Sequence, residues 1–486
     1  MNMIPTLYGH SLALLTDLYQ LTMAYGYWKQ GDRFGNATFH LFFRKLPFQG
    51  GYAIAAGLGT VLEILETFRF TAEDCDYLRT LRGNDGERLF EDGFLDMLQD
   101  LELACDIEAV PEGTAVFPNE PLLRVSGPIL QCQILETMLL CVVNFQTLIA
   151  TKSARICAAT AGAEVLEFGL RRAQGIDGSI TATRAAYIGG CSATSNVLAG
   201  KLLGIPVRGT HAHSWVMAFE TELEAFDAYA EAMPNNCVFL VDTYDTLEGV
   251  RNAVLVGQRL RARGHELVGI RLDSGDLAYL SIEARRILDE AGFPAAKIVA
   301  SNDLDEQTIE SLRHQGAPIA VWGVGTKLVT AFDQPALGGV YKLGAMQLPS
   351  GAWQPKLKLS EQRIKTSIPG RQQVRRFFNE RGLVGDMIYD ETLGVSGDRT
   401  IIDPDDPLRT HLPADDCQFV DLLQPVLRDG KRVDPRPPLE SMRDRTAMQF
   451  HDLHPTVLRL LNPHVYPVGL EAQLHALRES LIATHR

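Results

Sequence analysis

The stretch LVGIRLDSGD, residues 267–276, runs from small and apolar residues into a charged turn that contains glycine. A short apolar run that ends at Gly and Asp predicts a buried β-strand followed by a loop. Strands that alternate with helical stretches are typical of βα units around a parallel sheet. The same texture recurs on both sides, separated by helical spacing, in NCVFLVDTY (236–244), AKIVASND (296–303) and IAVWGVGT (319–326).

Similar runs extend the pattern from about residue 150 to about residue 345. About eight such units in roughly 200 residues predict an α/β barrel. Because the carboxyl ends of parallel strands share one end of a barrel, the polar residues after these runs should face one mouth. The further runs are AEVLEFGLRR (163–172), CSATSNV (191–197), IPVRGT (205–210) and GGVYKLGA (338–345).

The chain has 486 residues, which is more than one ordinary compact domain. We therefore expect three parts, with the barrel and its active site at 131–345. Residues 1–130 mix helical spacing with short strands broken by Pro and Gly, which predicts a mixed α+β N-terminal domain. Residues 346–486 are richer in charge and proline. The stretch 356–378 is strand-like without a partner nearby in sequence, so this C-terminal segment should partly return to the N-terminal domain and pack against it.

The composition excludes several function classes. A net charge of −14 argues against nucleic acid or an anionic membrane as the main partner, since both attract basic surfaces. The most apolar stretch, 134–150, is shorter than a membrane span and carries polar residues, which predicts a buried helix. The eight cysteines form no C-x-x-C pair, and the N-terminus lacks a basic region followed by a long apolar core. We therefore expect reduced thiols and a cytoplasmic protein.

Groups that suit anions follow several of the predicted strands. Arg171, Arg172 and Arg271 can bind anions in a forked geometry. The backbone amides of GVGT (323–326) and GG (338–339) can cradle a phosphate. Taken singly, each feature has an ordinary structural explanation as a turn or a salt bridge. Their coincidence on one predicted face favours an enzyme that handles a multiply phosphorylated substrate.

Carboxylates follow the same strands. Asp273 and Asp276 can hold Mg²⁺ through water, although Asp-Ser-Gly-Asp is equally common as a helix cap followed by a turn.

The stretch RGTHAHSWV (208–216) places His211 and His213 one residue apart, just past a predicted strand. The pair can serve as metal ligands, catalytic base, phosphate acceptor or loop residues bonded to the backbone. A metal-dependent barrel hydrolase would need more histidines at later strand ends. Those ends carry Asp242, Arg271, Asn302 and Thr326 instead. A non-catalytic phosphosugar-binding protein would need only the anion pocket, and turnover alone separates it from an enzyme.

Ordered motifs over most of the chain resemble the nicotinate phosphoribosyltransferase family. TDLYQLTM (16–23) is similar to the family's N-terminal signature, and the resemblance fades after about residue 380. The motifs that follow in order are FRKLP (43–47), AAGL (55–58), EFGLRRAQG (167–175), SNVLAGKLLGIPVRGTHAHSW (195–215), RLDSGDL (271–277), SNDLDE (301–306), GVGT (323–326) and GGVYKL (338–343).

The resemblance implies an enzyme that joins nicotinate to 5-phosphoribosyl 1-pyrophosphate and yields nicotinate mononucleotide and pyrophosphate in NAD biosynthesis. ATP would be hydrolysed as a co-substrate, with Mg²⁺ (or Mn²⁺) present. It also implies an irregular α/β barrel beside a mixed N-terminal domain. The expected assembly is a homodimer with the active site at the subunit interface.

The resemblance also places the binding residues. Tyr19 and Phe168 would stack on the pyridine ring, because a flat aromatic base needs aromatic walls. Thr210 and Arg271 would contact nicotinate. The phosphorylated sugar and its pyrophosphate would be bound by Arg171, Ser301, Asn302, Gly323, Gly325 and Thr326.

Two catalytic residues follow from the same motifs. Asp273 would lie near the sugar and its metal. His213, in the frame AHSW, corresponds to the histidine that the family phosphorylates, so it would become phosphohistidine. His211 occupies a position that varies in the family, and no role is carried over to it. The nicotinamide-using relative has aspartate where this chain has Ser195, and aspartate would repel a carboxylate ligand, so nicotinate is the expected base.

Overall fold

The computed structural model describes residues 3–362, 365–397 and 399–484, which fall into two compact units. Unit 1 combines Met1–Thr151 with Ala336–Arg486, and unit 2 is Lys152–Pro335. The chain leaves unit 1 along α7 (Glu136–Ala159), builds unit 2 and then returns. Unit 2 therefore begins later than the predicted residue 131, because most of α7 belongs to unit 1.

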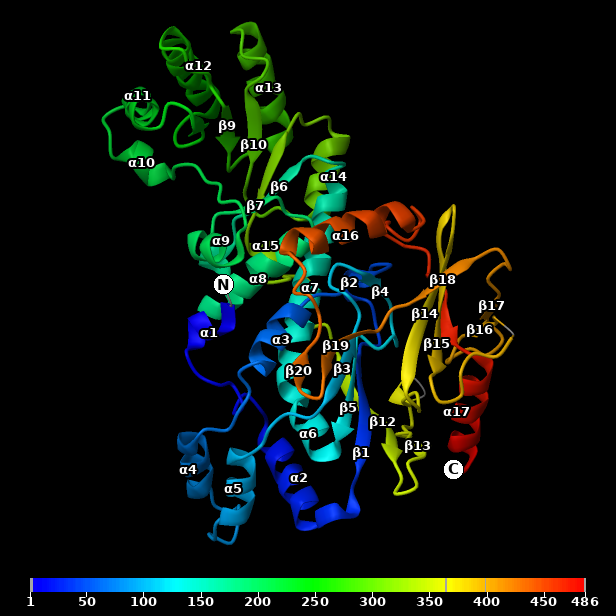
Figure 1. Cartoon of the computed structure of the whole chain (residues 1–486). Coiled ribbons are helices and arrows are strands. Elements are labelled where there is room, and N and C mark those ends of the chain that lie inside the picture. The colour runs from blue at the N-terminus through cyan, green and yellow to red at the C-terminus, as the bar shows by residue number, and fades with distance from the viewer. Residues whose placement is uncertain (1–2, 363–364, 398, 485–486) are drawn as a thin grey trace. The chain divides into compact units, whose positions relative to one another are not determined.

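Unit 2 alternates strands and helices, as its repeated runs predict (Figure 1). Its elements after α7 are β6 (Glu164–Glu167), the 3-10 turn η3 (Leu170–Arg172), α8 (Ile176–Ile188), β7 (Ala193–Thr194), α9 (Val197–Leu203), α10 (His213–Met217), α11 (Glu222–Ala232), β8 (Val238–Leu240), α12 (Thr246–Ala262), β9 (Gly269–Leu272), α13 (Leu277–Glu290), β10 (Lys297–Ala300), α14 (Glu306–His314), β11 (Val321–Val324) and α15 (Thr326–Val329).

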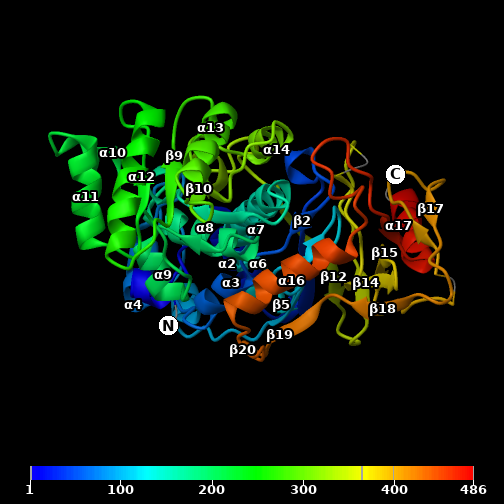
Figure 2. The same ribbon diagram turned by 90° about the horizontal axis from the view of Figure 1, so that it is seen from above.

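The strands of unit 2 form one parallel sheet, which has six members within the described residues, in the order β7-β6-β11-β10-β9-β8. In Figure 2, helices α11, α12, α13 and α14 appear in this order across the view, around strands β9 and β10. Leu166, Ala193, Val299 and Val321 come from four strands and form one core, against which Val238 of β8 packs. Both edge strands, β7 and β8, thus contribute to the same core, so the sheet curves around it. The predicted α/β fold is confirmed.

Unit 1 is built from both ends of the chain. Its helices are α1 (Met3–Tyr8), α2 (Leu18–Lys29), α3 (Leu58–Leu65), α4 (Ala72–Thr80), α5 (Asp92–Gln99), α6 (Ile129–Ile134), α16 (Leu439–Asp452) and α17 (Ala472–Thr484), with 3-10 turns η1 (Gly31–Arg33) and η2 (Pro47–Gln49). Its strands are β1 (Asn36–Phe42), β2 (Ala53–Ile54), β3 (Asp106–Ala109), β4 (Ala115–Val116), β5 (Leu123–Pro128), β12 (Val340–Gln347), β13 (Trp353–Pro355), β14 (Gln372–Asn379), β15 (Gly382–Asp390), β16 (Ile401–Ile402), β17 (Thr410–His411), β18 (Gln418–Asp421), β19 (Gln424–Arg428), β20 (Lys431–Arg432) and β21 (Val468–Leu470).

The C-terminal segment packs against the N-terminal part, as expected, through β19. This strand pairs antiparallel with β3 in a sheet of order β13-β12-β1-β5-β3-β19-β20. The rest of the segment forms its own sheet, of order β17-β16-β21-β15-β14-β18. The stretch 356–378 was predicted to return to the N-terminal part because it had no partner nearby, and that reason was wrong. Its strand β14 belongs to this second sheet, where it pairs with β15, the next strand along the chain, and with β18.

The run GGVYKLGA is the one barrel strand that the sequence places in the wrong unit. It forms β12, which pairs antiparallel with β1 in unit 1. The ring of Tyr341 stacks on Phe39 with centroids 5.0 Å apart, and its hydroxyl donates to the carbonyl of Cys132 at 2.8 Å. A short apolar run does not reveal whether its partner strand is parallel or antiparallel. The pairing with β1 is therefore decided by contacts distant in sequence.

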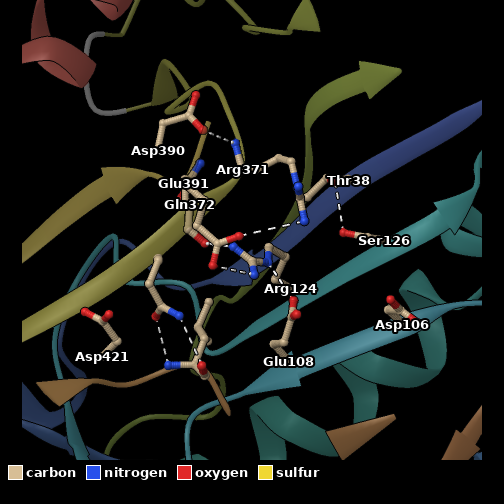
Figure 3. A network of polar contacts seen from close by, with 12 residues as sticks. Thr38, Asp106, Glu108, Arg124, Ser126, Arg371, Gln372, Asp390, Glu391 and Asp421 are labelled. Carbon is tan, nitrogen blue, oxygen red and sulfur yellow. Dashed lines mark hydrogen bonds and ion pairs between the residues drawn. The ribbon is translucent and has the colours of Figure 1, made fainter. Parts of the chain in front are cut away.

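A buried polar network fastens the two large sheets of unit 1 together (Figure 3). Its centre is Arg124 on β5, whose side chain is 2% exposed. Nε donates to Glu108 at 2.7 Å, Nη2 to Glu391 at 2.9 Å, and Nη1 to the carbonyl of Gln372 at 3.0 Å. All three guanidinium nitrogens thus have oxygen acceptors, which offsets the cost of burying the charge.

The apolar stretch 134–150 lies mainly within α7, as the predicted buried helix. Within the described parts of the chain, neither α7 nor any other helix combines the length and the apolar character that crossing a membrane requires.

Candidate active site

The functional side chains of unit 2 gather where its parallel strands end. Phe168 follows β6, Asp242 and Thr243 follow β8, Asp273 follows β9, and Ser301, further along the chain, follows β10. The strands run in the same direction, so their carboxyl ends meet at one rim.

Arg271 is the centre of this cluster. Its Nη1 donates to Thr210 Oγ1 at 3.0 Å, its Nε to Ser301 Oγ at 2.8 Å and its Nη2 to Asp273 Oδ1 at 2.9 Å. The guanidinium carbon lies 5.8 Å from the ring centroid of Phe168, and the side chain is 13% exposed. The structure thus brings together four residues that the sequence predicts to serve one site, with Ser301 as a fifth.

Asp273 is held in its ionised form. Burial opposes ionisation, but the hydrogen bond from Ser301 and the charge of Arg271 outweigh it, so the pKa of Asp273 lies below its ordinary value. Its second oxygen, Oδ2, lies 3.9 Å from His213 Nε2. A carboxylate that stays charged beside an arginine can stabilise a developing positive charge on a sugar.

His213 begins α10, and its side chain is 39% exposed. Nδ1 lies 3.1 Å from Thr243 Oγ1, while Nε2 faces Asp273. The hydroxyl of Thr243 therefore fixes the rotation of the imidazole ring, and one ring nitrogen remains directed at the cluster around Arg271.

Phe168 is packed by the two glycines of the GVGT motif. A Cβ atom on Gly323 would lie 2.7 Å from the Phe168 ring, and one on Gly325 would lie 3.1 Å from the Phe168 carbonyl oxygen. The amide of Phe168 donates to the carbonyl of Val324 at 2.8 Å. These two predicted phosphate-binding glycines therefore have a second purpose, because any larger residue would displace the aromatic wall.

Glu167 is a residue of this site that the sequence reasoning missed. It is buried, and it accepts hydrogen bonds from the hydroxyl groups of Thr183 at 2.8 Å and Thr194 at 2.6 Å, and from the amide of Gly169. These contacts tie the turn that carries Phe168 to α8 and β7. An acidic residue one position before Phe168, in an otherwise apolar run, was the available signal.

Three predicted sugar-phosphate residues lie on the rim, and in the described part of the chain none of them hydrogen-bonds to Arg271. Arg171 is exposed on η3, Thr326 begins α15, and Asn302 is exposed after β10. Asn302 has φ of 122°, a backbone conformation that residues other than glycine rarely adopt. Tyr19 lies in unit 1 on α2, and the residue is 49% exposed.

The carboxylates of the rim differ in the hydrogen bonds that their oxygens accept. Both Asp276 contacts are helix-capping bonds, from the amides of Ala278 and Tyr279, so the cap explanation holds for this residue. Asp242 Oδ2 accepts from the amide of Asp273 at 2.8 Å and from Ser274 at 2.6 Å. Its other oxygen, Oδ1, is buried without a hydrogen-bond partner among the described residues.

The oxygens of Asp242 and Asp273 suit a hard divalent cation. No group of three or more His, Cys, Asp or Glu side chains that could hold a metal occurs in the part of the chain that the structure describes. One or two carboxylates completed by water and substrate oxygens are the usual protein ligands of Mg²⁺.

His211 is buried, unlike its neighbour two residues on. Nε2 accepts a hydrogen bond from the amide of Leu240 at 3.2 Å, and the ring lies edge-on to Tyr229 with centroids 4.9 Å apart. Burial lowers the pKa of His211 to about 4, so the imidazole is neutral at physiological pH. It is therefore a structural acceptor, not a second solvent-facing base.

Known protein families match this chain along most of its length. Residues 14–144 match the nicotinate phosphoribosyltransferase N-terminal domain, residues 163–381 the nicotinate phosphoribosyltransferase family and residues 371–478 its C-terminal domain. The last match extends well beyond residue 380, where the resemblance of the motifs fades.

Comparison with individual proteins points to the same family. A nicotinate phosphoribosyltransferase from Bacillus subtilis (strain 168) is 45% identical over 467 residues, covering 95% of this chain and 93% of the relative. The crystal structure of human nicotinic acid phosphoribosyltransferase is 34% identical with a TM-score of 0.83, covering 96% of this chain and 99% of that one. A nicotinate-nucleotide pyrophosphorylase from Pyrococcus furiosus, 22% identical with a TM-score of 0.68 over 91% of this chain and 96% of its own, shares the fold. The chain belongs to the nicotinate phosphoribosyltransferase family.

Proposed function

We propose that the protein joins nicotinate to 5-phosphoribosyl 1-pyrophosphate, releasing pyrophosphate and nicotinate mononucleotide for NAD biosynthesis, with ATP as a co-substrate. Family membership supports the reaction. The observation that carries it is the cluster in which Arg271 joins Thr210, Asp273 and Ser301 beside the ring of Phe168.

The base-binding part of the cluster suits an aromatic carboxylate. Phe168 supplies a flat apolar wall, and Arg271 places a cation 5.8 Å from the ring centroid of that wall. A pyridine ring lying on Phe168 would present its carboxylate to the guanidinium and to the hydroxyl of Thr210. Charge-assisted bonds of this kind favour nicotinate over the neutral amide. Ser195, where the nicotinamide-using relative has aspartate, supports the same choice.

The sugar-binding part of the cluster suits a multiply charged phosphosugar. Asp273, ionised beside Arg271, would stabilise the cationic sugar as pyrophosphate leaves. Mg²⁺ would be held by Asp273 and Asp242 together with substrate oxygens and would neutralise charge on the leaving pyrophosphate. The phosphates would be bound by Arg171, Ser301, Asn302, Gly323, Gly325 and Thr326.

The coupling to ATP would pass through His213. A ring nitrogen attacks the γ-phosphorus of ATP, the bond to the bridging oxygen breaks, and ADP leaves. Water later hydrolyses the phosphohistidine and returns the free imidazole with inorganic phosphate. The phosphorylated side chain would carry up to about two negative charges at the rim and could order the loops that bear Arg171 and Arg271.

A homodimer would complete the site, with Tyr19 of a second copy covering the other face of the pyridine ring. Exposed apolar side chains support an assembly: Leu18, Tyr19 and Met23 on α2, and Ile176, Val197 and Met217 in unit 2. Tyr19→Ala and Arg271→Ala should each be inactive alone and recover activity in exchanged mixed dimers. Recovery absent from mixed dimers of proven composition would place the ring pocket within one chain.

The deciding experiment compares nicotinate and nicotinamide, each with and without ATP, and follows the mononucleotide product by chromatography. Product from nicotinate that increases with ATP is expected. Equal rates with nicotinamide would favour the nicotinamide-using alternative, and binding of the phosphosugar without any product would favour a non-catalytic binding protein.

A further inference from the structure

The parallel sheet of unit 2 has two edges, β7 and β8, yet both edge strands line one core. Edge strands present backbone N–H and C=O groups that need partners. The segment 206–211 runs from one edge to the other, and it is the seam of the barrel.

At β7 the segment 206–211 is joined to the sheet by hydrogen bonds between backbone groups. The amide of Thr194 donates to the carbonyl of Pro206 at 3.0 Å, and the amide of Arg208 donates to the carbonyl of Thr194 at 2.9 Å. Thr194 and Val207 thereby form a parallel bridge, so the segment behaves as one more short strand at this edge.

At β8 the segment 206–211 is joined to the sheet by a hydrogen bond to a side chain, that of His211. Leu240 pairs with Arg271 of β9 along one edge, while its amide donates to His211 Nε2 at 3.2 Å. Because Nε2 accepts, the proton of the neutral ring sits on Nδ1, which faces the carbonyl of Ala212 at 3.4 Å. The imidazole thus occupies the place that a strand carbonyl would take in a continuous ladder.

The residues around the ring keep it there. Tyr229, Phe226 and Phe239 surround it, with ring centroids 4.9, 6.0 and 6.4 Å from that of His211. Phe239 precedes Leu240 on β8, while Phe226 and Tyr229 belong to α11. The ring is consequently clamped between the strand that it completes and the helix that covers it.

The residues on either side of His211 belong to the active site. Thr210 accepts a hydrogen bond from Arg271, and His213 meets Thr243, which lies three positions after Leu240. We propose that His211 is a positioning residue that closes the barrel between β7 and β8 and thereby sets where Thr210 and His213 stand. This inference rests on the proposed roles of those two residues.

The test uses the full-length protein and two matched substitutions. His211→Gln keeps a side-chain acceptor at about the reach of Nε2, whereas His211→Leu fills similar volume without an acceptor. His265→Gln is the control, since this half-buried histidine bonds Asn235 outside the seam. The readouts are amide hydrogen exchange over residues 238–243, KM for nicotinate, and the ATP hydrolysed per mononucleotide formed.

For His211→Leu we expect exchange at Leu240 to rise by roughly tenfold or more, because a buried amide loses its acceptor. KM for nicotinate should rise and ATP hydrolysis should become uncoupled from product, whereas His211→Gln should restore all three towards wild type and His265→Gln should change none. Wild-type kinetics in His211→Leu, or identical exchange in the Leu and Gln variants, would overturn the proposal.

Two further outcomes also test whether His211 closes the barrel. If His211→Leu does not fold, a folded His211→Gln with a protected Leu240 amide supports the seam, and an unprotected amide in that variant overturns it. If the wild-type protein forms no mononucleotide, the proposed function fails, while hydrogen exchange in the same variants still decides whether His211 closes the barrel.

Discussion

Arg124 in unit 1 and Arg271 in unit 2 each donate through all three guanidinium nitrogens. The two networks differ in the burial of the arginine and in the groups that surround it. Arg124 is 2% exposed and is bonded to two carboxylates and a backbone carbonyl. Arg271 is 13% exposed, has one carboxylate partner within the described residues, Asp273, and borders the aromatic wall of Phe168.

The neighbours of the two arginines show the same contrast. Glu108, beside Arg124, is also paired with Arg428 at 2.7 Å. Near Arg271, Asp273 Oδ2 lies 3.9 Å from His213 Nε2, and buried Asp242 Oδ1 has no hydrogen-bond partner among the described residues. The network around Arg124, in which the buried charged groups are paired, holds two sheets together. The network around Arg271 leaves carboxylate oxygens that can still bind a ligand.

The largest effect should come from breaking the network around Arg124. Arg124→Met leaves Glu108 and Glu391 without their shared buried cation, which should lower the free energy of unfolding by about 3–5 kcal/mol. Chemical denaturation measures this loss, and the turnover of the folded protein should stay near wild type. Arg371→Met is the control, because Arg371 is partly exposed and 3.7 Å from Glu391. Equal losses in the two variants would mean that burial of Arg124 adds nothing.

Asp273→Asn should reverse that pattern, with stability near wild type and a large loss of catalysis. Removing the charge that faces the developing cation should lower kcat by about 10²–10³-fold. Steady-state kinetics and thermal melting on the same preparation separate the two effects. Asp276→Asn is a matched control because asparagine also caps helices and Asp276 makes capping bonds. A kcat within a few-fold of wild type for Asp273→Asn would remove this residue from the reaction.

Arg271→Ala should discriminate between bases. Loss of a charge-assisted contact to the carboxylate should cost roughly 1.5–3 kcal/mol, or about tenfold to somewhat over a hundredfold in kcat/KM for nicotinate. Any weak turnover of nicotinamide should change less. Arg251→Ala, on the exposed face of α12, is the control. Equal losses for the two bases would assign Arg271 to the sugar phosphate or to the fold.

The smallest effect concerns His40, which lies beside the Arg124 network. Its Nε2 accepts from the amide of Gln372 at 3.1 Å, and complete burial, followed by the charges of Arg124 and Arg371, holds its pKa well below the ordinary value. The unfolded chain therefore binds a proton below about pH 6.5 that the folded chain refuses. Stability from this residue is present above that pH and is lost as pH falls, with a slope of at most about 1.4 kcal/mol per pH unit.

The measurement for His40 is the free energy of unfolding between pH 7 and pH 5. His40→Gln keeps an acceptor for the Gln372 amide but does not titrate, so its pH dependence should be shallower than that of wild type. His454→Gln, an exposed histidine, should not alter the slope. Parallel curves for wild type and His40→Gln would show that His40 is already protonated in the folded protein.

The sequence allowed the α/β rhythm of residues 150–330 and the polar strand ends to be predicted, because both depend on local pattern. Thr210, His213, Arg271 and Asp273 could be named in advance and lie in one cluster. Glu167 was missed although its place beside Phe168 is visible in the sequence, because its bonds to Thr183 and Thr194 join residues 16 and 27 positions away. For the same reason, β12 was assigned to the barrel although its partner, β1, lies about 300 residues earlier.

By itself, the sequence determined the family, the reaction class and the residue types at the rim, since ordered motifs and local spacing are carried by neighbouring residues. The resemblance gave a role to His213 and none to His211, and only the tertiary structure decided what His211 does. His213 reaches the solvent-facing cluster, while His211 is buried against Leu240 and Tyr229. Burial sets the charge of His211, and hydrogen bonds to residues distant in sequence set the partner of each imidazole. Neither property follows from the residues next to them in the sequence.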